Sequence, residues 1–317
     1  MKQILITGGA GFVGSYLCNT FQALGYEVVA VDDLSNGKES NIKPGVHLEN
    51  IDLSTNDIFT KLNEYKFNAV IHCAAQSSNA LSFVDIKRDM DSNLVATYNI
   101  LEFCKDRKIN RLIYTSTLSV YGQTNQFPTP EHWEPKPDSY YAINKLAGEQ
   151  YIKLFSTYNK INYTIFRLFT TYGIGQNLEN RNQGLLSIYI SYILANEKLI
   201  VKGSPKRKRD IISINDVVDA IVKSIDNKIT YNKTYNLGSG KSLTIGKIIN
   251  LLIQGLAENP QEYSIEYDQS TLGDPFETLA DMSKIKTDLN WSPKLMPEEG
   301  IQKIIELYRE KIGEEKC

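Results

Sequence analysis

The sequence has few cysteines and histidines, no long apolar run and no large excess of either charge. No metal-binding or disulfide spacing joins its four cysteines and three histidines, which are Cys18, Cys73, Cys104, Cys317, His47, His72 and His132. No apolar run approaches the roughly 18 residues that span a bilayer, and no signal peptide precedes the first strand-like run, so we expect no membrane partner. Lys+Arg 35 against Asp+Glu 37 lacks the basic excess of nucleic-acid-binding proteins, so we expect no nucleic-acid partner. These absences predict a globular, cytoplasmic protein without a bound metal.

Short apolar runs alternate with segments of helical periodicity in the first half of the chain. The runs are continuous, as in strands buried on both faces, and cover residues 4–7, 28–31, 69–73, 111–115 and 163–168. Between the first two, apolar residues recur at helical spacing at Val13, Leu17, Phe21 and Leu24. Strands that alternate with helices predict an α/β fold with a doubly wound, Rossmann-type parallel sheet and a smaller mixed α/β domain.

A glycine-rich turn follows the first strand and opens the first helix, with the sequence Gly8-Gly9-Ala10-Gly11-Phe12-Val13-Gly14. Gly8 permits the tight turn, Gly11 lets the backbone approach a pyrophosphate, and Gly14 lets helix and strand pack closely. The helix N-terminus, at Phe12 and Val13, offers free N–H groups to an anion. A strand before the glycines and a helix after them favour a dinucleotide site over a merely structural turn.

Acidic residues follow the next strands and help to choose the dinucleotide. Asp32 ends the second strand, where it is placed to accept hydrogen bonds from the adenosine ribose. Asp32 and Asp33 would repel a 2′-phosphate, which favours NAD over NADP, and Asn36 is a candidate contact in the same loop. The alternative is that Asp32 serves only the local turn. Asp52 and Leu53 are placed to approach the adenine, although an ordinary Asx-turn is nearly as good an interpretation of Asp52.

Small and polar residues follow two further strands at the expected carboxyl edge of the sheet. Ala74, Ala75 and Gln76 follow the strand that ends at Cys73, and Thr115 ends the next strand along the chain.

We therefore expect an NAD-binding domain over residues 1–168 and a substrate-binding domain over 169–317, with segments around 211–240 returning to the first sheet. In the second half we predict a strand over 234–237 and helices over 185–194, from Asn215, from Thr244 and over 297–312.

Tyr141 and Lys145 lie four residues apart on a helix predicted to begin near Ser139, so they share one helix face. A free tyrosine has a pKa near ~10, too high for an efficient base at neutral pH. A nearby ammonium favours the phenolate, so we expect a lowered tyrosine pKa and a general acid–base pair. Because the chain has 19 tyrosines, such a pair also arises by chance, on a surface helix with a solvated lysine.

The segment Thr115 to Gly122 places further hydroxyl groups at the same edge. Here the chain resembles the extended short-chain dehydrogenase/reductase family, in its nucleotide-sugar epimerase and dehydratase branch. The resemblance covers nearly the whole chain and rests on the glycine-rich turn, the Tyr141 to Lys145 segment, Arg209-Asp210-Ile211-Ile212 and Trp291-Ser292-Pro293. It implies an NAD-dependent enzyme that acts on a nucleotide-diphosphate sugar and forms a homodimer through two long helices near Asn93 and Tyr141.

The resemblance also implies roles for particular residues. Thr117 takes the position of the catalytic Ser/Thr that hydrogen-bonds the sugar hydroxyl, and Tyr141 takes the position of the general base. Lys145 takes that of the lysine that holds the nicotinamide ribose and lowers the tyrosine pKa. Asn93 matches an asparagine near the active site, or is an ordinary polar helix residue.

The residues after Thr117 indicate the reaction. Dehydratases of the family carry an acidic pair there and decarboxylases a glutamate, whereas this chain has Leu118 and Ser119. We therefore expect a 4-epimerase that keeps its NAD and acts through a transient 4-keto intermediate. The alternatives are a 4-dehydrogenase, ketoreductase or dehydratase of the same family, or a non-catalytic NAD-binding regulatory protein, which would commonly lack the Tyr–Lys pair.

On the substrate side, the resemblance makes Arg209 the arginine that clamps the diphosphate, a task suited to a guanidinium. We expect Lys206 and Arg207 to lie on the surface. The sequence departs from many relatives at Thr170, where they carry Asn, and at Thr271 or Leu272, where they carry Arg. The expected substrate contacts are Ser119, Thr170, Gln183, Arg209 and Asp274.

Overall fold

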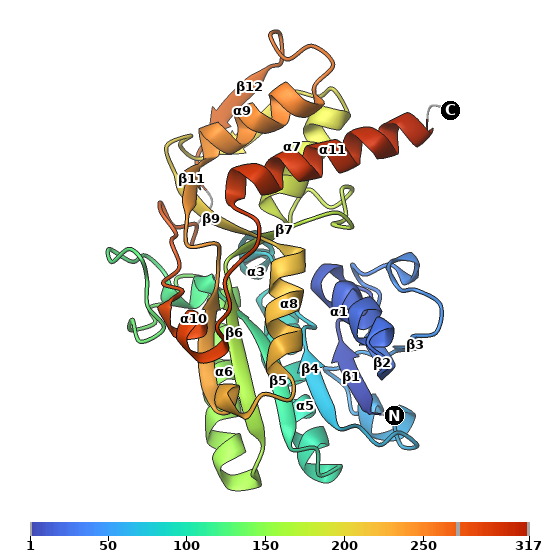
Figure 1. Ribbon diagram of the computed structural model, residues 1–317. Coiled ribbons are helices and arrows are strands. Elements are labelled where there is room, and N and C mark those ends of the chain that lie inside the picture. Colours follow the sequence, from blue (N-terminus) through green and yellow to red (C-terminus); the bar gives the residue numbers. More distant parts are fainter. Residues whose placement is uncertain (1, 271–272, 316–317) are drawn as a thin grey trace.

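A computed structural model describes residues 2–270 and 273–315, and a seven-stranded sheet forms its centre (Figure 1). The strand order is β10-β6-β5-β4-β1-β2-β3, and every neighbouring pair is parallel. This confirms the predicted doubly wound sheet. The strands are β1 (Gln3–Thr7), β2 (Glu27–Asp32), β3 (His47–Asn50), β4 (Ala69–His72), β5 (Arg111–Thr117), β6 (Asn162–Leu168) and β10 (Lys233–Leu237).

Helices cover both faces of this sheet because its strands carry apolar side chains on both sides. Ile4 and Ile6 of β1 pack in the layer formed by α1 (Phe12–Ala23) and α8 (Ile214–Ser224). Leu5 points to the opposite layer, which contains α2 (Asp57–Lys61), α5 (Ala96–Asp106) and α6 (Tyr140–Asn159). Two buried layers explain why these strands appear in the sequence as continuous apolar runs.

The strand order reverses between β1 and β4. At this point β1 runs beside β4, with Thr7 opposite His72, and β4 runs beside β5, which extends to Thr117. The carboxyl ends of the three strands therefore meet at one edge. In open α/β sheets, ligands bind outside such an edge at the point of reversal, so the fold directs attention to this place.

A smaller part of the chain lies beyond the carboxyl edge of the central sheet (Figure 1). It has a three-stranded sheet of β11 (Ser242–Thr244), β9 (Lys208–Ser213) and β7 (Thr170–Tyr172), and a parallel pair of β12 (Ile265–Asp268) and β8 (Leu199–Lys202). A third apolar core joins these strands to α7 (Leu185–Leu194), α9 (Ile245–Leu256) and α11 (Pro297–Glu315). The three helices lie where the sequence predicts them.

Short elements complete the chain. They are α3 (Asn79–Val84), α4 (Ile86–Met90), a π-helical stretch over Asp91–Val95, α10 (Ser283–Leu289) and 3₁₀ turns over Glu39–Asn41, Leu118–Tyr121 and Lys228–Thr230. Within the described ranges, no helix is long and apolar enough to cross a membrane. Cys317, Thr271 and Leu272, which entered the sequence argument, lie outside the described residues.

Candidate active site

The glycine-rich turn lies against the end of β4. Gly8 has φ +66°, and a Cβ there would lie 2.7 Å from the backbone nitrogen of Ala74. A Cβ on Gly14 would overlap the carbonyl oxygen of Gly8. Both positions therefore require glycine: Gly8 because of its left-handed backbone and its close neighbour, and Gly14 because helix and turn touch there.

The N-terminus of α1 carries the features of an anion site. Gly11 is its N-cap, no side chain caps it, and no acidic residue occupies its first turn. A Cβ on Gly11 would meet only the Gly8 carbonyl oxygen, at 3.2 Å, so the space beside the turn is otherwise open. The N–H groups of a first turn have no partners within their helix, and those of Phe12 and Val13 belong to this turn. These residues fit the pyrophosphate of a dinucleotide.

Asp32 is buried at the end of β2, and both of its carboxylate oxygens accept backbone hydrogen bonds. Oδ2 accepts from Ala10 N at 3.0 Å and Oδ1 from Leu34 N at 2.9 Å. Burial raises the pKa of Asp32, and these backbone donors oppose the rise. Each oxygen keeps a second lone pair for a ribose hydroxyl. Asp32 therefore serves the local turn and faces the glycine-rich turn at the same time.

The other loop residues of the predicted cofactor site are mostly bonded locally. Asp33 Oδ1 accepts from the backbone and hydroxyl of Ser35, at 3.0 and 2.6 Å. Asp52 is exposed and accepts from Ser54 N at 2.8 Å, which is the Asx-turn that the sequence left open. The remaining positions are partly buried Ala74, exposed Ala75, buried Leu53 and Thr115, whose hydroxyl donates to His72 O at 3.3 Å.

A buried carboxylate, Asp89 of α4, lies at the centre of an amide cluster. It accepts hydrogen bonds from Gln76 Nε2 at 2.7 Å, Asn93 Nδ2 at 3.1 Å and Asn144 Nδ2 at 2.8 Å. Burial raises the pKa of Asp89, and the three amides oppose the rise. The cluster ties two predicted cofactor residues, Gln76 and Asn93, to the residue before Lys145. The sequence analysis missed Asp89, although its position four residues before Asn93 was a signal of a shared helix face.

The three predicted catalytic residues lie around the end of β5 and the start of α6. Thr117 is the last residue of β5, and Ser139 caps α6, so Tyr141 occupies the first turn of that helix. Thr117 lies beside the phenol of Tyr141 and acts to lower the pKa of that phenol. Lys145 lies one turn further along α6, with Nζ 4.0 Å from the centroid of the Tyr114 ring. Tyr141 is 8% exposed, at the edge where the glycine-rich turn also ends.

The pKa values of Tyr141 and Lys145 differ from what the sequence leads us to expect. Burial raises the pKa of Tyr141 to about 12, with the Thr117 hydrogen bond opposing the rise and the charge of Asp89 adding to it. Burial lowers the pKa of Lys145 to about 7, although Cys73, Glu149 and Asp89 favour its charged form. The predicted lowering of the phenol pKa is therefore wrong for these surroundings. Both groups lose hydration, and burial favours the neutral form of each.

A buried ion pair fixes α6 against the sheet. Glu149, one turn after Lys145, accepts from Arg167 of β6 at 2.9 and 2.7 Å and from the Ser116 hydroxyl of β5 at 2.7 Å. Burial raises the pKa of Glu149, but the hydrogen bonds and charge of Arg167 outweigh that effect and hold it below its usual range. The strand that carries Thr117 and the helix that carries Tyr141 are thereby held in one position.

On the substrate side, two buried arginines share one carboxylate. Arg209 Nη2 donates to Asp274 Oδ1 at 2.6 Å, and Arg207 Nη1 donates to Asp274 Oδ2. Each arginine is 4% exposed, so the expectation that Arg207 lies on the surface is wrong, whereas Lys206 is exposed as expected. Side chains two residues apart on an extended chain point to the same side, which explains why Arg207 follows Arg209 inward.

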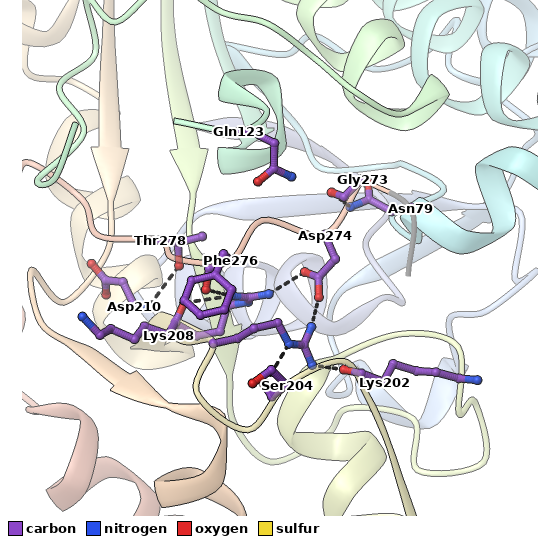
Figure 2. Close-up of polar contacts among 12 residues, drawn as sticks. Asn79, Gln123, Lys202, Ser204, Lys208, Asp210, Gly273, Asp274, Phe276 and Thr278 are labelled. Atoms are coloured by element: carbon purple, nitrogen blue, oxygen red, sulfur yellow. Dashed lines mark hydrogen bonds and ion pairs between the residues drawn. The ribbon is translucent and has the colours of Figure 1, made fainter. Parts of the chain in front are cut away.

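A cavity of about 520 Å³ lies beside this cluster, and Arg207, Asp274 and Gln123 line it (Figure 2). It is connected to the start of α6: Asn79 donates to Gly273 O at 3.4 Å and accepts from the hydroxyl of Ser139, the cap of α6, at 3.0 Å. The segment that carries Asp274 is therefore tied to the cap of the helix that carries the predicted base.

The remaining predicted substrate contacts are spread around this region. The Ser119 hydroxyl accepts from Thr117 Oγ1 at 3.2 Å, and Thr170 begins β7 opposite Ile211. Gln183 accepts from Asn36 Nδ2 at 3.0 Å and donates to the Ser77 hydroxyl. Gln183 thus lies among the loops of the predicted cofactor site rather than in the cavity of Arg207.

Comparison with known proteins identifies the family of this chain. The fold and the site define an NAD-dependent short-chain dehydrogenase/reductase of the extended type. The model of the NAD dependent epimerase/dehydratase family matches residues 4–238. The chain is also 31% identical over 304 residues to a putative UDP-glucose 4-epimerase of Methanocaldococcus jannaschii, covering 96% of this chain and 97% of that protein. The chain therefore belongs to the NAD dependent epimerase/dehydratase family; it is an enzyme, and NAD is its cofactor.

Two solved structures show the same architecture. The UDP-glucose 4-epimerase of Thermotoga maritima, determined with UDP-glucose, has a TM-score of 0.90 and 30% identity, covering 98% of this chain and 99% of that one. The UDP-glucose 4-epimerase of Thermus thermophilus, determined with NAD, has a TM-score of 0.90 and 26% identity, covering 97% and 99%. Both cover the smaller part of the chain as well as the central sheet.

Proposed function

We propose that the protein interconverts the C4 epimers of a UDP-hexose while it retains its NAD. The observation that carries this proposal is the cluster at the end of β5, in which Thr117 lies beside Tyr141 and Lys145 follows one turn along α6. Two relatives of similar architecture are named UDP-glucose 4-epimerases, and one was determined with UDP-glucose. The cavity of Arg207 supplies space for the nucleotide part.

In the proposed reaction, the Thr117 hydroxyl and the Tyr141 phenol hold the sugar O4 between them. Bound NAD would supply a hydride acceptor for C4, which would return the hydride to the opposite face of the 4-keto sugar, and a positive ring that would favour the phenolate. Tyr141 takes the O4 proton as the carbonyl forms and gives it back as the carbonyl is reduced. The sugar gains and loses two electrons within one cycle, so the net reaction is an isomerisation.

We assign the cofactor to the residues that meet at the point of strand reversal. Gly8, Gly11 and Gly14 form the turn that would carry the pyrophosphate, and Asp32 would accept the adenosine ribose. Lys145 would hold the nicotinamide ribose from α6. Two features support this assignment. The N-terminus of α1 has no side-chain cap and suits an anion, and the carboxylate of Asp32 keeps free lone pairs for the ribose hydroxyls.

The residues after Thr117 favour epimerisation over the other reactions of the family. Leu118 and Ser119 begin a 3₁₀ turn, and Ser119 accepts the Thr117 hydroxyl group's hydrogen bond. Neither side chain can remove a proton from C5 or expel a hydroxyl group. A dehydratase would need such a group, and a net dehydrogenase or ketoreductase would need to exchange its cofactor in each turnover. A regulatory protein without activity would not need Tyr141 beside Thr117.

The test is to incubate the purified protein with UDP-glucose or UDP-galactose without added cofactor and to measure the C4 epimer by chromatography. Tyr141→Phe is expected to lower the rate by about 10²- to 10⁴-fold, because it removes the proton acceptor. Tyr140→Phe is the matched control, since Tyr140 is 38% exposed on the same turn. The proposal fails if no nucleotide hexose is epimerised, or if Tyr141→Phe is as active as the control.

We also propose a homodimer and a cytoplasmic location. Of 17 exposed large apolar side chains in the described chain, 11 lie on α3 to α6: Leu81, Phe83, Val84, Ile86, Met90, Tyr98, Tyr140, Ile143, Tyr151, Leu154 and Tyr158. Such a concentration of apolar surface is typical of a covered interface. Cys18, Cys73 and Cys104 are free thiols, as expected in a reducing compartment.

The dimer is tested by sedimentation of two charge variants. Leu154 is 65% exposed on α6, so Leu154→Glu is expected to shift the mass from dimer to monomer without loss of the fold. Leu24→Glu is the control, because Leu24 is 55% exposed at the end of α1 on the opposite layer. A monomeric wild-type protein, or a dimer that survives Leu154→Glu, would contradict the proposed interface.

A further inference from the structure

The cavity beside β9 contains an arginine that the family resemblance does not assign. Its wall is formed by Arg207 and Asp274, with the aromatic side chains of Tyr267 and Phe276 beside them. Arg209, the arginine that the resemblance favours as the diphosphate clamp, does not line the cavity. Figure 2 shows Asp274 between the two guanidinium groups, with dashed lines to each. The cation that faces the cavity is therefore Arg207.

The backbone around Arg207 holds its guanidinium in place. Nε donates to Ser204 O at 3.2 Å, and Nη2 donates to Lys202 O. Gly203, with φ +77°, passes beside the guanidinium, and a Cβ on Gly203 would lie 2.8 Å from Arg207 Nε. Any side chain at Gly203 would displace the arginine. The turn before β9 is thus shaped around Arg207, as expected for a site rather than for a solvated basic run.

The charges of the cluster do not balance. Arg207 and Arg209 both pair with Asp274, and both side chains are 5% exposed. The other partners of the two guanidinium groups are neutral carbonyl oxygens, at Lys202, Ser204, Lys208 and Phe276. The other carboxylate of the cavity wall, Asp268, pairs with Lys202. Two arginines that share one carboxylate therefore leave one positive charge at the cavity wall. Buried charge without a counterion is unfavourable, so the cavity favours an anionic ligand.

We propose that Arg207 is a second ligand of the substrate's diphosphate and that it sets the preference for a diphosphate over a monophosphate. This inference rests on the proposed function. Asp274 holds the two guanidinium groups side by side, and a fork of N–H donors suits phosphate oxygens better than a single ammonium does. Gly273, next to Asp274, is joined through Asn79 to Ser139, the cap of the helix that carries Tyr141.

The experiment is calorimetric titration of the NAD-loaded protein with UDP, UMP and uridine, on the wild type and on three variants. Arg207→Gln is expected to weaken UDP binding by about 10- to 150-fold, because charged hydrogen bonds contribute roughly 1.5–3 kcal/mol. The affinity of Arg207→Gln for UMP should fall by less than its affinity for UDP, and its affinity for uridine should change little. Arg207→Lys keeps the positive charge but lacks the forked N–H donors, so its UDP affinity should lie between those of the wild type and Arg207→Gln. Lys206→Gln removes a charge from the exposed neighbour and should bind UDP within about twofold of the wild type.

Two results would overturn the assignment: UDP binding within about twofold of the wild type in both Arg207 variants, or equal losses for UDP and uridine. Equal losses would mean that Arg207 only supports the cavity. If Arg207→Gln does not fold, as judged by its melting temperature, Arg207→Lys and its ratio of UDP to UMP affinity decide. A wild-type protein that binds no diphosphate, with GDP and dTDP also tried, would sink the proposed function itself. If the wild type binds a nucleoside diphosphate and Arg207→Gln binds it equally well, only the role of Arg207 would be refuted.

Discussion

A single methyl group, added at Gly11 of the glycine-rich turn, should distinguish an effect on cofactor binding from an effect on folding. Gly11 has φ −76° and ψ 178°, which alanine adopts without strain, and a Cβ there meets only the Gly8 carbonyl oxygen at 3.2 Å. Gly11→Ala should therefore cost the fold no more than about 1 kcal/mol. The same methyl group would occupy the space beside the first-turn N–H groups of α1. If the pyrophosphate lies there, crowding of about 1–3 kcal/mol should weaken NAD binding by roughly 5- to 150-fold.

The assay is thermal unfolding of the protein, followed by titration of NAD into protein from which the cofactor has been removed. Gly14→Ala is the comparison, because its Cβ would overlap Gly8 O, a contact that the turn cannot relieve without moving. Gly11→Ala should keep its melting temperature and lose NAD, whereas Gly14→Ala should lose both. If Gly11→Ala binds NAD like the wild type, or unfolds like Gly14→Ala, the pyrophosphate does not lie on this turn.

Three further predictions follow from the buried charges near the site. Asp89 raises the pKa of Tyr141, so Asp89→Asn should move the rise of activity with pH to lower pH, as measured from kcat profiles. Thr117 lowers that pKa, so Thr117→Val should move the same limb to higher pH, while Thr117→Ser should restore it. Glu149→Gln leaves buried Arg167 without its partner and should cost about 3–5 kcal/mol, a fall in Tm of about 5–8 °C for this length. Because the folded pKa of Glu149 is lowered, its contribution is present above its unfolded pKa and lost as pH falls through the folded one, so this deficit should shrink in acid.

The doubly wound sheet could be predicted because its strands are buried on both faces. Continuous runs such as 4–7 and 111–115 have no exposed face to interrupt them with polar residues, so each appears in the sequence as a block. β3 lies at the sheet edge, where His47 and Asn50 are exposed, so no continuous apolar run marks it and the sequence indicates only its end, near Asp52. The helix start at Ser139 was predictable from local chemistry, since its hydroxyl caps α6.

The arginines show what local pattern could not give. Lys206 to Arg209 is a run of four basic residues, and sequence alone cannot tell which of them turn inward. That choice depends on β9, whose pairing with β11 fixes the side to which Arg209 points, and on Asp274, which lies 65 residues further along the chain. A partly buried carboxylate from a distant segment thus holds Arg207 in its inward position. The same holds for Asp89, whose partner Asn144 lies 55 residues away.

The acid–base pair shows that residue spacing does not determine a pKa. Tyr141 and Lys145 lie four residues apart, as a phenol and an ammonium that stabilise each other should, yet burial drives both toward their neutral forms. A neutral phenol is the state that folding favours at the edge of a tightly packed sheet. In the proposed reaction the phenolate gains the O4 proton as the sugar is oxidised and gives it back as the carbonyl is reduced. The buried phenol must therefore be ionised before the sugar is oxidised, and the positive nicotinamide ring of NAD held at the glycine-rich turn would supply the charge that favours the phenolate.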